Sequence, residues 1–517
     1  MKKHAFFVAL GIFFSRIAGL IRERVFAHYF GNSDAGDAFK AALKIPNFLQ
    51  NLFGEGVLSA SFIPVYAQML AKKHDEDAAK VASVVGSLLF VLTSVLVLFG
   101  VLATPALIDL IAPGFSGEKR ELTIKIVEIL FPGTGFLVMS AWCLGILNSH
   151  KKFFLSYVAP VIWNVAIIVA MIGWSHQDQF QLAITTSYGL VVGSFLQFFV
   201  QLPFALKLGR KIYPSLNVNV DGVRTVMKSF FPVVLSRGVV QVSAYIDNVL
   251  ASLLPAGAVS ALAYAQTLYL LPVSLFGMSV SAAELPAMSQ AVGTEEEVKQ
   301  YLRNRLDSGL RQIAFFIVPS VVAFLFLGDL VVGAIFQTGV FDKDSTNYVW
   351  VVLAGYSVGL LASTLGRLYS STFYSLKDTK TPLKLAILRV FLSTGLGIFG
   401  AFYLPNLLGV DPKWGTAGLT LTAGLVGWID FSLSRYILNR KIGKTGVDLG
   451  FMSKLWGAAI ASATVAFLTK LLLNDFSHVI LRAAIALGVY GILYFAIGYA
   501  LKIEQAHSLV GKIKRRF

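Results

Sequence analysis

The sequence predicts an all-α integral membrane protein with fourteen transmembrane helices, arranged as two pseudo-symmetric six-helix lobes and two C-terminal helices. Composition is the first observation behind this fold class: 56% of the 517 residues are hydrophobic and only 14% are charged, against about a quarter charged in soluble domains. The second is the alternation of basic loops along the chain, and the third is an internal repeat. A soluble fold is excluded.

Fourteen apolar segments are long enough to cross about 30 Å of hydrocarbon. The first begins MKKHAFFVALGIFF, like a signal peptide, but continues through Arg16 and Arg22 without a small-residue cleavage site, so we expect a retained helix. The loops are too short for a soluble domain, which argues against a conventional enzyme. The expected spans are 5–29, 35–70, 80–112, 121–148, 153–174, 181–206, 226–254, 257–291, 308–336, 346–374, 381–403, 416–438, 451–474 and 479–501.

Basic residues set the expected orientation. Lys and Arg outnumber Asp and Glu by 44 to 28, a net charge of +16, but they lie in short runs between apolar segments, which suits a membrane protein better than a nucleic-acid binder. The positive-inside rule makes the side with these runs cytoplasmic, and both termini are expected there. The main exception is the EKRE sequence at 118–121. A single cysteine, Cys143, excludes a disulfide framework, and we expect no cofactor and no cysteine-based metal cluster.

Self-comparison indicates a repeat of two six-helix halves. At an offset near 222, Ser15-Arg16 pairs with Ser236-Arg237 and Pro64 with Pro286, while SHKKF corresponds to SLKDTKTP. We therefore expect an N-lobe at 1–206, a cytoplasmic linker at 207–225, a C-lobe at 226–444, and the last two helices with a basic tail at 445–517. Parallel repeats of this kind commonly place substrate at their seam; duplication for packing alone is the alternative.

Fixed charge inside the first helix points to a function. Arg16 lies near mid-depth, where a cation costs at least about 2.5 kcal/mol, so it should face water, an acidic partner or an anionic ligand. A salt bridge with Asp37 or Glu23 is the structural alternative. Arg22 and Arg24 lie further toward the outside.

The second span carries a polar stripe at helical spacing, which should line a water-filled cavity or form a buried seam between helices. Pro46 and the Gly54-Glu55-Gly56 sequence predict bends in this span. With Arg237 of the second half, the stripe's cations would surround a cavity suited to phosphate. The stripe consists of Asp37, Lys40, Lys44, Asn47, Asn51, Glu55 and Ser59.

Five motifs together resemble the MurJ (MviN) family, lipid II flippases of the multidrug/oligosaccharidyl-lipid/polysaccharide (MOP) exporter superfamily. They are SRIAGLIRE, DAFKAALKIPNFL, LFGEGVLSASFIPVY, APVIWN and FYSLKDTKTP. The resemblance implies alternating access that carries a lipid-linked disaccharide-pentapeptide to the outer leaflet of the bacterial cytoplasmic membrane for peptidoglycan and cell-wall biogenesis, with the cell-wall synthesis machinery as an expected partner.

The resemblance also assigns residues. Arg16, Arg22 and Asp37 occupy positions of functionally required residues, and Lys44, Glu55 and Ser59 are further matches. Structural or gating roles are expected for Gly19, Pro46, Gly54, Gly56, Pro64, Pro160, Asn164 and Asp378. The last two helices would hold the polyprenyl tail.

Two departures from the family pattern remove cavity cations. Gln50-Asn51 and Gln266-Thr267 stand where many members carry arginines, and we hypothesise that Lys40 and Arg237 restore that charge, with Gln266 still lining the site. Asp247 is a candidate sodium ligand, although Ser393 and Gly397 supply little to assist it. The excess of positive charge in the cavity makes the membrane potential the alternative driving force. An exporter of another polyprenyl-linked oligosaccharide is the alternative function, ahead of a drug exporter or a membrane scaffold.

Overall fold

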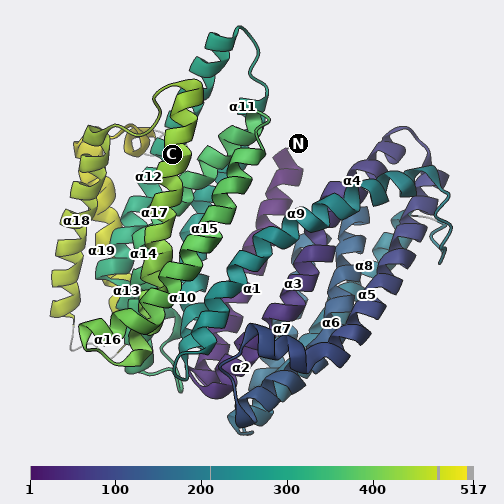
Figure 1. The fold of residues 1–517 in the computed structure, drawn as a ribbon, viewed down its shortest axis with the longest axis horizontal. Helices are drawn as coiled ribbons and strands as arrows, with labels where there is room; N and C mark the ends of the chain where they lie inside the picture. Colours follow the sequence, from purple (N-terminus) through teal and green to yellow (C-terminus); the bar gives the residue numbers. More distant parts are fainter. Residues whose placement is uncertain (1, 210, 474–477, 509–517) are drawn as a thin grey trace. The chain divides into compact units, whose positions relative to one another are not determined.

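The computed structural model describes the backbone of residues 2–209, 211–473 and 478–508, and the side chains in these ranges except those of 2–10, 12, 55 and 235–244. All regular elements within these ranges are helices (Figure 1). The chain forms two compact units: unit 1 is Met1–Ser260 with Thr338–Val340, and unit 2 is Ala261–Gln337 with Phe341–Phe517. The all-helical part of the predicted fold class is confirmed.

In the described ranges, unit 1 holds nine helices and the first residues of a tenth. They are α1 (Lys2–Phe30), α2 (Asp34–Ala42), α3 (Lys44–Phe53), α4 (Glu55–Ala71), α5 (Asp75–Ile111), α6 (Gly117–Ser149), α7 (Phe153–Gly173), α8 (Gln179–Gly209), α9 (Asp221–Ser252) and the start of α10 (Ala258–Pro272).

Unit 2 continues α10 and holds the remaining helices. They are the π-helical η1 (Val273–Met278), α11 (Ser279–Ser289), α12 (Glu295–Phe326), α13 (Gly328–Phe336), α14 (Lys343–Ser375), α15 (Lys380–Ile398), η2 (Phe399–Tyr403, π-helical), α16 (Leu404–Leu408), the short 3₁₀ turn η3 (Pro412–Trp414), α17 (Gly415–Ile442), α18 (Leu449–Leu472) and α19 (Val479–Ala500).

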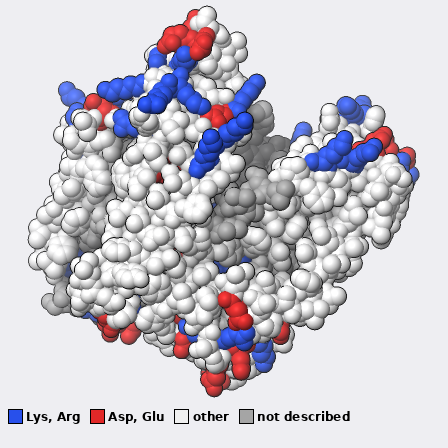
Figure 2. Space-filling view, viewed as in Figure 1, with Lys and Arg blue, Asp and Glu red and all other residues white. Residues whose placement is uncertain are grey.

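Eleven helical segments in the described ranges are long and apolar enough to cross a membrane. Figure 2 shows Lys and Arg gathered at the helix ends, with flanks that are nearly free of charge. The predicted spans 5–29, 35–70 and 226–254 are not among the eleven. Residues 5–29 and 226–254 include side chains outside those described, and 35–70 is divided into three short helices. The eleven segments are α5, α6, α7, α8, Ala258–Ser289, α12, α14, Lys380–Leu408, Pro412–Ile442, α18 and α19.

Helix α9 packs with unit 1, whereas the repeat assigns it to the second lobe. Val223, Val226 and Phe230 are buried in a core that contains Leu58 and Phe62 of α4. Apolar contacts with α4 and α5 therefore hold α9 in unit 1. The compact units divide the chain within α10, and the lobe boundaries expected from the repeat stay a prediction.

The turns after α6 and α14, which the repeat pairs with each other, have the same conformation. Lys151 and Lys377 both adopt a left-handed backbone, with φ of 60° and 59°. Glycine is the usual residue at such helix ends, and another residue there costs about 1 kcal/mol. In both turns two successive N–H groups bond back to the last helical turn, from Lys151 and Lys152 to Asn148 and Leu147, and from Lys377 and Asp378 to Tyr374 and Phe373.

The C-terminal helices are attached to unit 2 through α12. Pro319 of α12 has no N–H, so the carbonyl of Phe315, four residues earlier, lacks its helical donor. The phenol of Tyr494 supplies one at 2.7 Å, and the phenol of Tyr490 donates to the carbonyl of Pro319 at 2.8 Å. Helix α19 is therefore held by polar contacts as well as by apolar packing.

Asp378 stabilises the loop between α14 and α15 through hydrogen bonds and an ion pair. Its carboxylate accepts the Thr381 N–H at 3.0 Å and the Thr381 hydroxyl at 2.6 Å, and it pairs with Lys441 of α17. Burial raises the pKa of this carboxyl, but Lys441 and Thr381 together outweigh burial and hold the pKa well below its usual value. The ionised Asp378 carboxylate therefore stabilises the folded protein at pH values above the ordinary Asp pKa of about 3.9. This contribution is lost as the pH falls through the lowered pKa of Asp378.

We expect Asp378→Ala to lower the unfolding temperature at pH 7 more than Asp378→Asn, because Asn retains an acceptor for the Thr381 N–H. Loss of charge alone should cost about 0.5–1 kcal/mol, and loss of the acceptor about 1 kcal/mol more. Thermal unfolding of the purified protein measures both. The gap between wild type and Asp378→Asn should narrow in strong acid; equal unfolding temperatures for the two variants would refute the proposed role of the backbone bond.

Candidate functional site

Glu23 of α1 is the centre of a buried charge cluster. Its Oε1 pairs with the Arg22 guanidinium at 2.7 Å, and its Oε2 pairs with the Lys40 ammonium of α2 at 2.5 Å. Glu23 and Lys40 are only 8% and 7% exposed. Breaking a buried pair of this kind costs about 3–5 kcal/mol, so the cluster fixes α2 against α1.

Each of the two cations of this cluster lies over an aromatic ring. The Lys40 ammonium lies 4.1 Å from the centre of the Phe26 ring, and the Arg22 guanidinium lies 4.9 Å from the centre of the Trp163 ring on α7. Ring faces attract cations, most strongly where water is excluded. One carboxylate serves two cations, so Arg22, Glu23 and Lys40 together carry a net positive charge.

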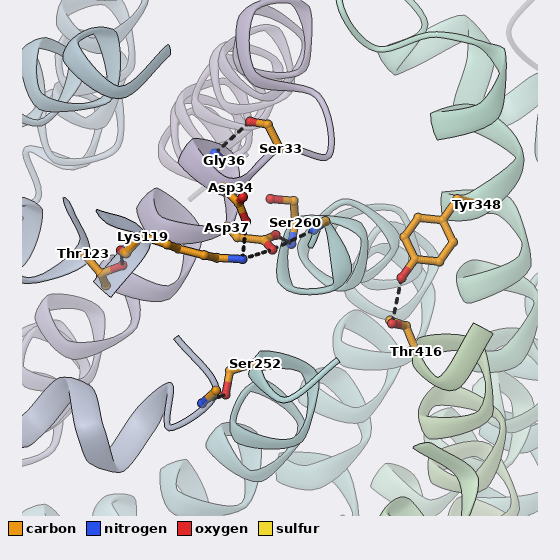
Figure 3. A network of polar contacts seen from close by, with 12 residues as sticks. Ser33, Asp34, Gly36, Asp37, Lys119, Thr123, Ser252, Ser260, Tyr348 and Thr416 are labelled. Carbon is orange, nitrogen blue, oxygen red and sulfur yellow. Dashed lines mark hydrogen bonds and ion pairs between the residues drawn. The ribbon is translucent and has the colours of Figure 1, made fainter. Parts of the chain in front are cut away.

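Asp37 forms a second buried centre, shown in Figure 3. Its side chain is 1% exposed. Its carboxylate pairs with Lys119 of α6 at 2.8 Å and accepts the backbone N–H groups of Gly257 at 2.8 Å and Ser260 at 2.7 Å. The N–H groups at the start of α10 are unsatisfied within the helix and attract negative charge. Asp37 therefore ties α2 to both α6 and the beginning of α10.

Gly257 is required by this arrangement. Its φ of +87° is strained for other residues, and a Cβ there would lie 2.6 Å from the carbonyl oxygen of Asn32. The backbone of the loop before α10 thus comes close enough to α2 for its N–H to reach Asp37.

The exception to the charge rule at 118–121 is explained by local pairing. Lys119 contacts both Asp34 and Asp37, each at 2.8 Å, and Arg120 pairs with Asp109 at 2.7 Å. Both cations are thus neutralised by acids at the same ends of the helices.

The predicted polar stripe of 35–70 is divided by two breaks. The first lies at Leu43, just before the predicted Pro46 bend, and the second lies at Gly54. The predicted bends are therefore complete breaks in the helix: the backbone of Gly54, with φ of −90° and ψ of −138°, is not helical, and a Cβ there would collide with the Gln50 carbonyl oxygen. Asp37 and Lys40 are buried before the breaks, whereas Asn47, Asn51 and Ser59 are exposed after Leu43.

Other predicted residues are distributed over both units. Arg16 is exposed on α1, and no ion pair joins it to a described side chain. Lys44 lies within electrostatic reach of Asp247. Gln266 is half-buried in unit 2, Pro64 is exposed within α4, Gly56 is half-buried in its first turn, and the side chains of Glu55 and Arg237 are outside the described set.

The predicted gating residues of α1 and α7 meet each other. A Cβ at Gly19 would lie 4.0 Å from the Asn164 side-chain oxygen, within ordinary contact. Asn164 is 3% exposed, and its side-chain amide donates to the carbonyl of Pro160, one helical turn earlier, at 2.8 Å. This bond fixes the amide within α7 at the point where α7 packs against α1.

In the described ranges, no group of three or more His, Cys, Asp or Glu side chains is placed to hold a metal ion. The chemistry of the Glu23 cluster is that of ion pairs and anion recognition. Guanidinium groups bind phosphate in a bidentate manner, and exposed amides add neutral donors.

Sequence reasoning missed Lys119, Trp163 and the N–H groups of Gly257 and Ser260. Lys119 carried one usable signal, because EKRE broke the charge rule on that side. The contacts of Trp163 and of the start of α10 depend on how distant segments pack, which single-sequence patterns do not reveal.

Known proteins are similar to this chain over nearly its whole length. Residues 26–487 match the family model described as "Lipid II flippase MurJ". A "Probable lipid II flippase MurJ" of Buchnera aphidicola subsp. Schizaphis graminum is 30% identical over 93% of each chain, and a "Lipid II flippase MurJ" of Burkholderia cenocepacia is 31% identical over 87% of this chain and 86% of that one.

Solved structures show the same fold. One described as "Lipid II flippase MurJ, inward closed conformation" has a TM-score of 0.79 and 26% identity, and the match covers 96% of this chain and 99% of that chain. An inward-facing multidrug resistance MATE family transporter of the MOP superfamily has a TM-score of 0.66 at 17% identity, covering 83% of this chain and 94% of its own, and shares the fold alone.

We expect Asp37→Ala to destabilise the protein by about 3–5 kcal/mol, because it leaves two buried N–H groups without an acceptor and Lys119 short of a partner. Asp34→Ala is the matched control, since Asp34 pairs with the same lysine but is 49% exposed; its loss should cost less than about 1 kcal/mol. Thermal unfolding in detergent compares the two. Equal losses would show that the buried N–H bonds contribute nothing.

Proposed function

Because this chain belongs to the lipid II flippase MurJ family, we propose that it carries lipid II, an undecaprenyl-diphosphate-linked disaccharide-pentapeptide, from the inner to the outer leaflet of the cytoplasmic membrane by alternating access. It is a multi-pass membrane transporter and not an enzyme. The family match over residues 26–487 is the observation that carries this conclusion. Its role is in peptidoglycan synthesis.

We propose fourteen membrane spans, by adding α1, the α2–α4 segment and α9 to the eleven apolar segments. Helix α1 has 29 residues, or about 43 Å at 1.5 Å per residue, which exceeds the hydrocarbon thickness of about 30 Å. The Glu23 pairs lower the cost of its charges. The basic loops favour a cytoplasmic location for both termini, and labelling of His176→Cys or Lys211→Cys from either side of the membrane, each in a Cys143→Ser background, tests this orientation.

The diphosphate of the substrate is best matched by the exposed polar residues of unit 1. Arg16 is exposed on α1, and Asn47 and Asn51 are exposed on α3. Arg22 is held by Glu23 with 20% of its side chain exposed. We propose that Arg16 and Arg22 bind the diphosphate and that the amides contact neighbouring polar groups.

Lys40 supports this site through Glu23. Its ammonium is buried and paired, so it offsets the acid that would otherwise cancel the charge of Arg22. We propose that Lys40 and Arg237 replace the two missing arginines. For Lys40 this replacement is indirect, because Lys40 neutralises Glu23 and so leaves the charge of Arg22 available.

We propose the membrane potential as the driving force. Lys44 already supplies positive charge beside Asp247, which competes with sodium for that carboxylate. Each charge moved through 100 mV supplies about 2.3 kcal/mol. Lipid II flipping in proteoliposomes, with the potential and the sodium gradient set separately, distinguishes the two sources.

Complementation tests the proposed function. The gene should restore growth of a bacterium depleted of its own lipid II flippase, whereas Arg16→Ala should not, because the diphosphate loses a cation. Immunoblots must show equal amounts of both proteins in the membrane. Failure of the wild-type chain to move labelled lipid II, with transport of another polyprenyl-linked oligosaccharide, would favour the alternative function.

A second complementation series tests Lys40. Lys40→Ala with Arg237→Ala should reduce growth, and Glu23→Gln should restore part of it, because the acid that cancels the charge of Arg22 is then removed. Restoration would identify Lys40 as a residue that acts through Glu23. Full growth of the Lys40→Ala and Arg237→Ala double variant would contradict charge replacement altogether.

A further inference from the structure

A cavity of about 520 Å³ lies in unit 1, away from the charge clusters of Glu23 and Asp37. It is formed where α4, α6 and α8 end and α5 begins. Tyr66, His150, Lys151 and Lys207 are among its lining residues. We call it the Tyr66 cavity. Its volume falls within the range of about 300–1,000 Å³ that is typical of small-molecule sites.

Tyr66 and His150 make one polar wall of the Tyr66 cavity. Tyr66 is 1% exposed, and its phenol lies 3.1 Å from Nε2 of His150. The rings meet edge to face with their centres 5.9 Å apart. This contact joins α4 to the end of α6 and holds the imidazole in place, so the wall is set before any ligand arrives.

Positive charge dominates the lining. Lys151 and Lys207 are opposed by a single acid, Asp75. Neither lysine has an ion pair with any described side chain, whereas Lys80 and Lys211, outside the lining, pair with Asp77 and Glu76. The two lysines of the cavity are therefore available to an external anion.

The lining chemistry favours a phosphate group. At neutral pH a phosphodiester carries one negative charge and a phosphate monoester nearly two, so two ammonium groups can neutralise either kind of phosphate, and hydroxyl and imidazole groups add hydrogen-bonding partners. Leu70 and Leu208 complete the lining with apolar surface. In the orientation proposed above, this end of the helices lies at the cytoplasmic face, where anionic headgroups are concentrated.

We propose that the Tyr66 cavity binds a phosphate-bearing ligand at the cytoplasmic surface, either the headgroup of an anionic phospholipid or a soluble phosphate ester. Lys151 and Lys207 supply the charge, and the pair of Tyr66 and His150 supplies the fixed wall. The site does not depend on the proposed transport function. A bound ligand contacts the ends of three helices at once, so it stabilises unit 1.

The test measures thermal unfolding of the full-length protein, purified in detergent and depleted of lipid, with two probes. One is inorganic phosphate, with chloride at matched ionic strength as its control, and the other is phosphatidylglycerol in mixed micelles, with phosphatidylcholine as its control. Each probe that binds raises the unfolding temperature with saturation. A shift with phosphate identifies a soluble ligand as sufficient, and a shift with phosphatidylglycerol alone identifies the lipid headgroup.

Variants assign the shift to the cavity. Lys151→Gln with Lys207→Gln should weaken apparent binding by at least about tenfold. Lys80→Gln with Lys211→Gln removes the same charge outside the lining and should leave binding unchanged. Both pairs are exposed, so both variants should fold. The proposal would be overturned if neither probe raised the unfolding temperature. It would also be overturned if the Lys151→Gln and Lys207→Gln variant kept the shift, or if the Lys80→Gln and Lys211→Gln variant lost it equally.

Discussion

Acidic side chains buried among apolar helices set the architecture of unit 1. A carboxylate in such surroundings is tolerated only when charges and donors meet it directly. Glu23 meets this requirement with Arg22 and Lys40, and Asp37 meets it with Lys119 and backbone groups before and in α10. Helix α2 has only nine residues, too few to be stable alone. The contacts that neutralise its charges also hold it in position.

The second predicted span has a buried part and an exposed part along one stretch of chain. Its buried part, with Asp37 and Lys40, joins helices, while its later part presents Asn47 and Asn51 on the surface. The break at Gly54 gives α4 a direction of its own. A ligand meeting the exposed part therefore does not need to disturb the pairs that hold α2.

Much of this organisation follows from sequence, because hydrophobic length and charge placement act locally. Helices, the bends near Pro46 and Gly54, and the family were all predictable on that basis. The partner of Asp37 was not, since Lys119 is remote in the chain and no pattern links them. Lys40 was predicted to face a cavity and is instead paired with Glu23, because helical spacing shows which residues share a face but not what that face meets. The repeat likewise gave no indication that α9 packs against α4.

The positions of Lys119 and Arg120 have a consequence for insertion of the chain into the membrane. In the proposed orientation both cross the membrane during insertion, against the tendency of cations to stay behind. Their acidic partners Asp34, Asp37 and Asp109 all precede them in the chain, so these acids are synthesised first and reach the far side before the cations do. The order of residues along the chain thus places each counter-charge before the cation that it meets in the folded protein.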